Sequence, residues 1–182
     1  MKKILFLLLI VSNSLFAQNA KVEAEAIKTK MDAFTSKTGS IIRFIDYKLP
    51  ELKTQYSAPE TRIRRVNAGN TTSYFYQIKK TTKYGEVTAS IEYSDLLEII
   101  KAVNIQKAEF DKDVSGSHDY LENRFITIDG FQVGYYVDKG KGAWYLTLEK
   151  YGTDKTLFIN DSEIIMQAFN EAKLKIEELK KQ

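Results

Sequence analysis

The fold is indicated most clearly by residues 124–150, which read RFITIDGFQVGYYVDKGKGAWYLTLEK. Apolar and polar side chains alternate along three short runs of this stretch, as they do along half-buried β-strands. Asp129-Gly130 lies between the first two runs, and an Asp-Gly pair flanked by alternating residues is a strong signal for a β-hairpin. The stretch therefore predicts antiparallel strands at 124–128, 131–137 and 143–150.

The lengths of the turns predict which side chains share a face, because side chains alternate along a strand. A two-residue turn at the Asp-Gly pair places Phe125 opposite Gly134. A four-residue loop after the second strand places Tyr136 opposite Tyr145, and a strand at 155–159 follows. The predicted aromatic surface consists of Phe125, Tyr136, Tyr145 and Phe158. The opposite, apolar face is expected to pack under helices and consists of Ile126, Ile128, Phe131, Val133, Tyr135, Val137, Trp144, Leu146, Leu148, Leu157 and Ile159.

Two interpretations of the predicted aromatic surface remain open. One face of an antiparallel sheet is often solvated, and a solvated face rarely carries so many aromatic side chains unless something covers them. If another segment of the chain covers this face, the four residues belong to the core. If no segment covers it, the same four residues are the candidate surface for a ligand or a partner.

The rest of the sequence predicts helices and a second set of strands. Residues 21–36 carry apolar side chains near helical spacing, and Gly39 ends that helix. Ser94 begins a second helix and Asp161-Ser162-Glu163 a third, because such residues stabilise helix N-termini. Further strands are predicted at 40–47, 62–66, 71–82 and 86–92. Together these elements predict an α+β fold: an N-terminal helix followed by two units of antiparallel sheet plus helix, with the helices on one side.

The two units share a plan. The tripeptide KYG occurs at 83–85 and at 150–152, and each copy precedes a strand, a Ser-acid pair and an apolar helix. In the first copy, a two-residue turn at Tyr84-Gly85 would place Ile78 opposite Ile91. This is the pattern of a degenerate tandem repeat, although so few identities also arise by chance. The layout resembles that of secreted inhibitory proteins of the β-lactamase-inhibitor type, but no shared motif accompanies it and no function is implied.

The first residues predict a targeting segment rather than a structural element. Lys2 and Lys3 precede an unbroken apolar run from Ile4 to Val11, and a short stretch then ends in Ala17. This is the layout of a secretory signal peptide at residues 1–17, with cleavage after Ala17 or, as an alternative, three residues later. A retained membrane anchor is the other interpretation, but the run is much shorter than the roughly 20 residues that cross a bilayer.

The mature chain is then expected to be a single domain over 18–182, with sub-units at about 38–112 and 119–182. The sequence contains no cysteine, which excludes disulfides, thiol chemistry and a lipid anchor on a cysteine. We therefore expect an exported protein, periplasmic or secreted, that is not lipid-anchored and has no transmembrane segment in its mature chain.

The charge of the chain gives no support for nucleic-acid binding. The loss of two lysines with the leader reduces the net charge from +3 to +1, whereas nucleic-acid binding requires a strong basic excess. Six basic residues nevertheless cluster on neighbouring predicted strands: Arg62, Arg64, Arg65, Lys79, Lys80 and Lys83. They form either an anion-binding patch or, in better agreement with the near-neutral charge, a charged edge that prevents strand-to-strand aggregation.

One motif has the spacing of a calcium-binding loop. Asp111, Asp113, Ser115, Asp119 and Glu122 stand where an EF-hand loop has oxygen ligands, with a glycine at the sharp turn. The segment after it predicts a strand rather than the second helix of an EF-hand. A polar loop between helix and strand is therefore the preferred interpretation, and we predict no metal site.

The single histidine, His118, lies in the same segment, and no catalytic motif such as a nucleophile elbow surrounds it. No glycine-rich phosphate loop is present either. The sequence thus predicts no catalytic residues and no cofactor. The favoured function is a non-enzymatic exported binding or interaction module of unknown ligand, whose partner is an unknown protein or a small apolar molecule. The alternative is a periplasmic carrier of a small apolar or lipid-like ligand, and an enzyme is the third and weakest interpretation. A carrier would need an apolar cavity of about 300 Å³ or more between sheet and helices.

Overall fold

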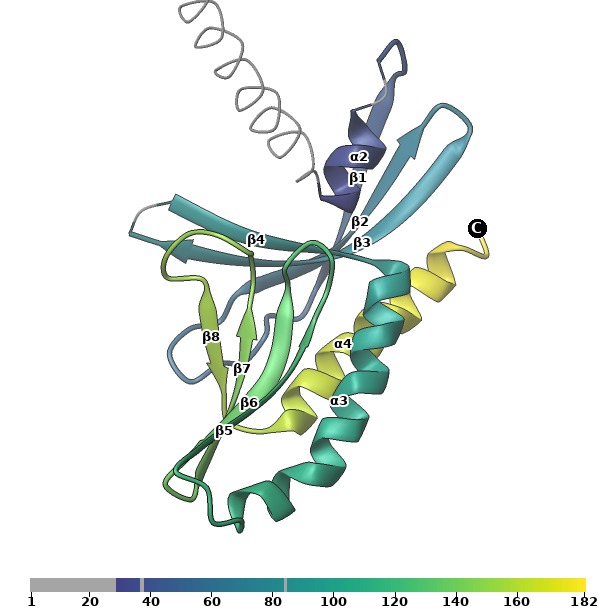
Figure 1. Ribbon diagram of the computed structural model, residues 1–182. Coiled ribbons are helices and arrows are strands. Elements are labelled where there is room, and N and C mark those ends of the chain that lie inside the picture. Colours follow the sequence, from purple (N-terminus) through teal and green to yellow (C-terminus); the bar gives the residue numbers. More distant parts are fainter. Residues whose placement is uncertain (1–28, 37, 84) are drawn as a thin grey trace, which may run out of the picture.

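The structure, a computed structural model, describes residues 29–36, 38–83 and 85–182. It has an α+β fold with two four-stranded antiparallel sheets, and each sheet is followed by a long helix (Figure 1). The predicted fold class is therefore confirmed. The first unit consists of α2 (Lys30–Thr35), β1 (Ile42–Leu49), β2 (Glu60–Ala68), β3 (Thr71–Thr82), β4 (Gly85–Glu92) and α3 (Tyr93–Val114). The second consists of β5 (Tyr120–Ile126), β6 (Gln132–Asp138), β7 (Lys141–Thr147), β8 (Thr156–Ile159) and α4 (Ser162–Leu179).

The two long helices bury the apolar stripes that their sequences predict. Helix α3 begins after the cap residue Glu92, and α4 begins after Asp161, whose carboxylate accepts a hydrogen bond from the backbone of Glu163. Helix α4 packs Phe169 against Tyr76 of the first sheet, with ring centroids 5.3 Å apart. Phe169 also lies 6.0 Å from Phe131, just before β6 in the second sheet. One buried cluster therefore contains side chains from both units.

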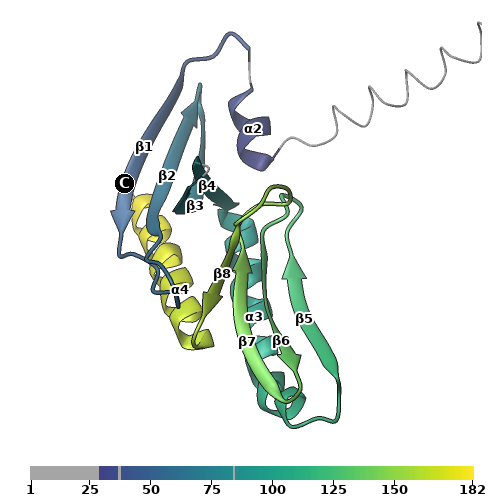
Figure 2. The same ribbon diagram turned by 90° about the vertical axis from the view of Figure 1, so that its left-hand side faces the viewer.

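The short helix α2 lies on the other side of the first sheet (Figure 2). Neighbouring residues of β3 establish this, because side chains alternate along a strand. Tyr76 points to α4, whereas the amide of Gln77 lies 3.6 Å from the sulfur of Met31 in α2. Helices α3 and α4 therefore cover the inner faces of the sheets, and α2 covers part of the outer face of the first sheet. The predicted first helix extends back to residue 21, but residues before 29 lie outside the described ones.

At each hairpin for which the sequence predicts a register, the strands pair in a different register. Between β3 and β4, Ile78 pairs with Ala89 and Tyr76 with Ile91, two residues from the predicted alignment. Between β6 and β7, Lys139 and Gly140 both have positive φ, 48° and 74°, as a two-residue type I′ turn requires. The four-residue loop expected there is therefore wrong. A shift of two residues leaves every side chain on its predicted face.

The Asp-Gly hairpin differs in a more consequential way. Here Ile128, Asp129 and Gly130 form a three-residue loop, with Thr127 donating its backbone N–H to the carbonyl of Phe131. Gly130 has φ of +86°, which fits the glycine of a hairpin loop with a bulge. The register between β5 and β6 is thus shifted by one residue, and every side chain of β5 changes face.

Candidate functional site

The outer face of the second sheet carries three of the four residues predicted to form an aromatic surface. Tyr136, Tyr145 and Phe158 come from β6, β7 and β8. The ring of Tyr136 lies 6.4 Å from that of Tyr145 and 6.5 Å from that of Phe158. Tyr120 of β5 stacks on Tyr136 from the other side at 6.3 Å. A row of four aromatic rings, each from a different strand, therefore crosses this face.

Phe125 does not belong to this row, and its predicted position is wrong. The one-residue shift pairs Phe125 with Val133, so its side chain packs against the core with those of the inner face. The same shift turns Ile126 and Ile128 outward, and they are 48% and 85% exposed instead of buried. Tyr120 takes the place of Phe125, and sequence reasoning missed it because the strand was expected to begin at residue 124. The side-chain alternation of 120–126 would have identified Tyr120 only with the correct loop length.

The four aromatic residues differ in how far they are buried. Tyr120 is 61% exposed, Tyr136 and Phe158 are half-buried, and Tyr145 is only 6% exposed. The Tyr145 hydroxyl donates a hydrogen bond of 2.5 Å to Oε1 of Glu122, and Nη1 of Arg124 lies 3.8 Å from Oε2 of that carboxylate. Tyr145 is therefore the buried base of the face. Tyr120, Tyr136 and Phe158 are accessible, and Glu122 and Arg124 add a charged pair.

Among the described residues, no helix or strand lies over the outer face of the second sheet (Figure 2). A shallow hollow of about 340 Å³ lies directly on it, lined by Tyr136, Tyr145 and Phe158 together with polar neighbours such as Gln132 and Thr156. The first sheet differs, because α2 covers part of its outer face, where the sulfur of Met31 lies 3.6 Å from the amide of Gln77. The second sheet thus presents aromatic side chains that no described element covers.

The buried hydroxyl of Tyr145 predicts a specific response to alkaline pH. Burial raises the pKa of Tyr145, and the carboxylate of Glu122 raises it further. The native state then favours the neutral hydroxyl, so its contribution to stability is complete below the unfolded pKa of about 10 and is lost as the pH rises toward the folded pKa. The variant Tyr145→Phe has no proton to lose at this position. Its free energy of unfolding should therefore fall less steeply than that of the parent as the pH rises above about 10.

Chemical denaturation at several pH values measures this difference. Tyr56→Phe is the matched control for removal of a tyrosine hydroxyl, because Tyr56 is 84% exposed. Equal slopes for Tyr145→Phe and the parent would contradict the assignment of Tyr145 as a buried tyrosine.

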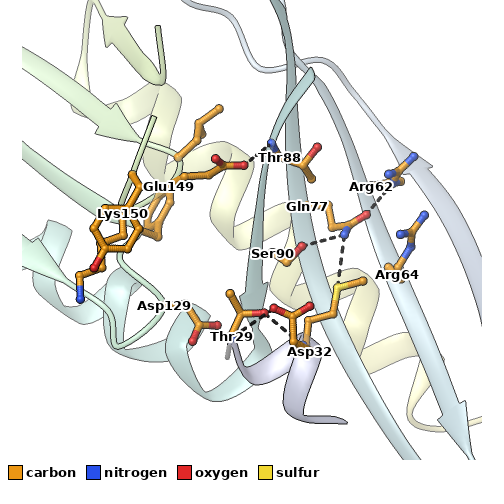
Figure 3. A pocket seen from close by; sticks show the side chains of 14 residues that line it. Thr29, Asp32, Arg62, Arg64, Gln77, Thr88, Ser90, Asp129, Glu149 and Lys150 are labelled. Atoms are coloured by element: carbon orange, nitrogen blue, oxygen red, sulfur yellow. Dashed lines mark hydrogen bonds between the residues drawn. The ribbon is translucent and has the colours of Figure 1, made fainter. Parts of the chain in front are cut away.

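A second hollow, of about 490 Å³, lies between α2, the outer face of the first sheet and the turns near Asp129 and Lys150 (Figure 3). Gln77 lies in its wall, where it accepts a hydrogen bond from Nε of Arg62 at 2.7 Å and donates one to Ser90 at 2.8 Å. The carboxylate of Asp129 accepts the backbone N–H of Lys30 at 3.0 Å. Because three segments distant in sequence form this hollow, no sequence pattern predicts it.

The charged groups around this hollow are largely engaged with one another. Arg64 binds both carboxylate oxygens of Asp46 at 2.7 Å, and this pair lowers the pKa of Asp46. Burial raises the pKa of Asp129, against the opposing effect of the Lys30 backbone N–H. Glu149 accepts the backbone N–H of Thr88 at 3.2 Å. The arrangement connects α2 and the second unit to the first sheet, and the walls of the hollow combine these charged groups with apolar side chains such as Met31, Phe131 and Leu148.

The predicted basic patch is divided among several carboxylates. Lys79 lies 3.2 Å from Glu60 and 3.1 Å from Glu86, and Lys80 lies 2.7 Å from Asp154. Arg62 and Arg64 share Asp46. Arg65 points to the opposite face of β2, where its Nε donates to Asn67. These pairings do not favour a site for an external anion. The charged-edge interpretation is wrong as well, because β2 and β3 are the central strands of their sheet.

The calcium-like segment does not gather its carboxylates. Helix α3 extends to Val114, so Asp111 and Asp113 lie on its last turn, and Asp113 accepts a hydrogen bond of 2.6 Å from Tyr135. Glu122 lies on β5 and binds Tyr145. Within residues 29–36, 38–83 and 85–182, no group of three or more His, Cys, Asp or Glu side chains is placed to hold a metal ion. His118 is exposed in the loop and packs beside Gly116.

Comparisons with protein-family models, with curated proteins and with solved structures find no match for this chain. Inferences about its function therefore rest on its sequence and on the geometry of the molecule.

Proposed function

We propose that this protein is an exported, non-enzymatic binding module whose outer face on the second sheet contacts a protein partner. The observation that carries the proposal is the uncovered row of aromatic rings. Tyr120, Tyr136 and Phe158 are its accessible members, and Tyr145 is its buried member. Aromatic side chains, with tyrosine prominent among them, supply much of the binding energy in protein interfaces. The neighbouring Glu122–Arg124 pair adds polar contacts at the edge of this face.

The proposal of export depends on sequence alone. The predicted signal peptide at 1–17 lies outside the described residues, so its apolar run and small terminal residue are the support. No helix in the described part of the chain is long and apolar enough to cross a membrane.

The alternative of an apolar-ligand carrier has less support. Aromatic rings fill the space between sheets and helices, where Phe110 lies 5.0 Å from Tyr135 and 5.3 Å from Trp144. The hollow of about 490 Å³ lies on the other side of the first sheet, outside the core, and charged groups alternate with apolar side chains on its walls. The enzyme interpretation is weakened because the carboxylates that line this hollow already accept hydrogen bonds from backbone N–H groups.

A photo-crosslinking experiment tests the proposed surface. A benzophenone amino acid at Phe158 should yield a discrete adduct with another protein when cells that export the chain are irradiated. The same amino acid at Leu174, which is 63% exposed on α4, is the matched control and should yield none. Addition of Tyr136→Ala should reduce the Phe158 adduct by about tenfold, because loss of one aromatic anchor costs on the order of 1–2 kcal/mol.

The mass of the adduct identifies the partner as a different protein or a second copy of this chain. No adduct at Phe158, or equal adducts at Phe158 and Leu174, would contradict the proposal.

A further inference from the structure

The strand β5 presents a free sheet edge next to the proposed binding face. Sheet order places β1, β4, β5 and β8 at the four edges. Two of these edges are partly covered, because Glu149 accepts the N–H of Thr88 in β4 and Gln55 donates its N–H to the carbonyl of Phe158 in β8. In Figure 2, no described element lies beside the outer edge of β5. An unprotected edge of this kind is a template for pairing with another strand.

The chemistry of β5 differs from that of the other open edge. Strand β1 carries Arg43 and Lys48 as exposed cations, and charged residues of this kind discourage edge-to-edge pairing. Strand β5 reads YLENRFI and contains neither lysine nor proline. Its charged residues, Glu122 and Arg124, have opposite signs. Apolar side chains at its two ends, Tyr120 and Ile126, are 61% and 48% exposed.

The backbone of β5 determines which residues can pair with a new strand. Thr127 donates its N–H to Phe131 and Asp119 accepts the N–H of Lys139, so the odd-numbered residues of this strand direct their backbone groups to β6. In an antiparallel pair the intervening residues direct theirs away from that partner. Tyr120, Glu122, Arg124 and Ile126 therefore present their N–H and C=O groups to the free edge.

We infer that β5 pairs with β5 of a second copy of this chain, antiparallel, with Asn123 of each copy at the two-fold axis. This register places Glu122 opposite Arg124 of the second copy and Arg124 opposite its Glu122. The same register places Tyr120 opposite Ile126 at both ends. All four outward residues then form hydrogen-bonded pairs across the interface, and the exposed side chains of Tyr120 and Ile126 cover each other.

The neighbouring registers are disfavoured by charge. A shift by two residues in one direction places Glu122 opposite Glu122 of the second copy. A shift by two in the other direction places Arg124 opposite Arg124 of the second copy. Like charges directly opposite each other are destabilising. Odd-numbered shifts would align outward backbone groups with inward ones and lose the hydrogen bonds. The strand is therefore complementary to itself in a single register, as a two-fold interface requires.

The resulting dimer has one continuous eight-stranded sheet. The two-fold axis is perpendicular to the sheet, so both copies of α3 lie on one side and both aromatic rows on the other. Tyr120 lies at the junction, stacked on Tyr136 of its own chain. The dimer therefore joins the two proposed binding faces into one surface, and this arrangement does not depend on which partner that surface binds.

Charge reversal tests the inference. Sedimentation equilibrium of the protein, purified from a host that exports the full chain, should give a mass twice that of one chain. Arg124→Glu places like charges together at two symmetric positions. We expect its dimer dissociation constant to rise by about a hundredfold, roughly tenfold for each position. Glu122→Arg should have a similar effect, and Glu122→Arg combined with Arg124→Glu should restore the dimer because opposite charges again face each other.

A matched control and a folding measurement complete the experiment. Arg43→Glu reverses an exposed charge on the other open edge, β1, and should leave the dissociation constant unchanged. Circular dichroism should show native structure in every variant. A monomeric parent protein, or a parent dimer that persists in folded Arg124→Glu, would overturn the inference. A folded double variant that remains monomeric would also overturn it.

Discussion

Replacement of Phe169 by alanine is expected to lower the free energy of unfolding by about 3–5 kcal/mol, the range for truncation of a buried aromatic side chain. Phe169 is 1% exposed and lies at the junction of α4 with both sheets. Its ring contacts Tyr76 edge-on at 5.3 Å and Phe131 at 6.0 Å. The truncation therefore leaves a cavity that neither sheet can fill alone. Chemical denaturation measures the loss.

Leu174→Ala is the control on the same helix. Leu174 is 63% exposed, so its truncation should change the free energy of unfolding by no more than about 0.5 kcal/mol. Equal effects of the two substitutions would mean that Phe169 does not pack in a core shared by the two sheet-plus-helix units. A large loss for Phe169→Ala alone agrees with one core shared between them.

The second large effect is expected at the base of the aromatic row. Tyr145→Ala should lower the free energy of unfolding by about 3 kcal/mol, at the lower end of the range for buried aromatic residues. Tyr145 is 6% exposed and its hydroxyl binds Glu122, so truncation removes both packing and a hydrogen bond. A melting curve and a denaturant titration measure this loss.

Tyr136→Ala provides the comparison on the same face. Its ring is half-buried, and we expect a cost of about 1 kcal/mol. A larger loss of unfolding free energy for Tyr145→Ala than for Tyr136→Ala indicates that Tyr145 stabilises the fold, whereas Tyr136 and Phe158 are available to a partner. Similar losses for Tyr136→Ala and Tyr145→Ala would show that the whole row belongs to the core. The surface proposed for binding would then be wrong.

Most of the elements were predictable because their signals are local. Strand β3 was expected at 71–82 and occupies that range, and the N-terminal cap of α4 follows from Asp161. The buried stripe of α4, with Ile165, Phe169 and Ala172, follows from helical periodicity. The alternation of β6 and β7 similarly predicts that Val133 and Leu146 face inward. Each of these features depends on neighbours within a few residues.

The candidate site was predictable only in part. The turns next to Tyr136, Tyr145 and Phe158 were predicted with the wrong lengths. These errors shift the strand register by two residues, and a shift of two leaves the three side chains on one face. Phe125 was misplaced because an Asp-Gly pair fits both a two-residue turn and a three-residue loop with a bulge. These loops differ by one residue, and one residue is enough to exchange Phe125 for Tyr120 on the outer face.

Local patterns in the chain were enough to establish the two-unit α+β plan, the helix caps and the faces of β6, β7 and β8, since these depend on periodicity and nearby hydrogen bonds. The face of β5, the hollow beside α2 and the open edge beside Tyr120 emerge only in the folded molecule. They depend on the packing of Gly130 against the side chain of Lys150, on the position of α2, and on which strand ends lack a neighbour. Such contacts join residues far apart in the chain, and no local pattern encodes them.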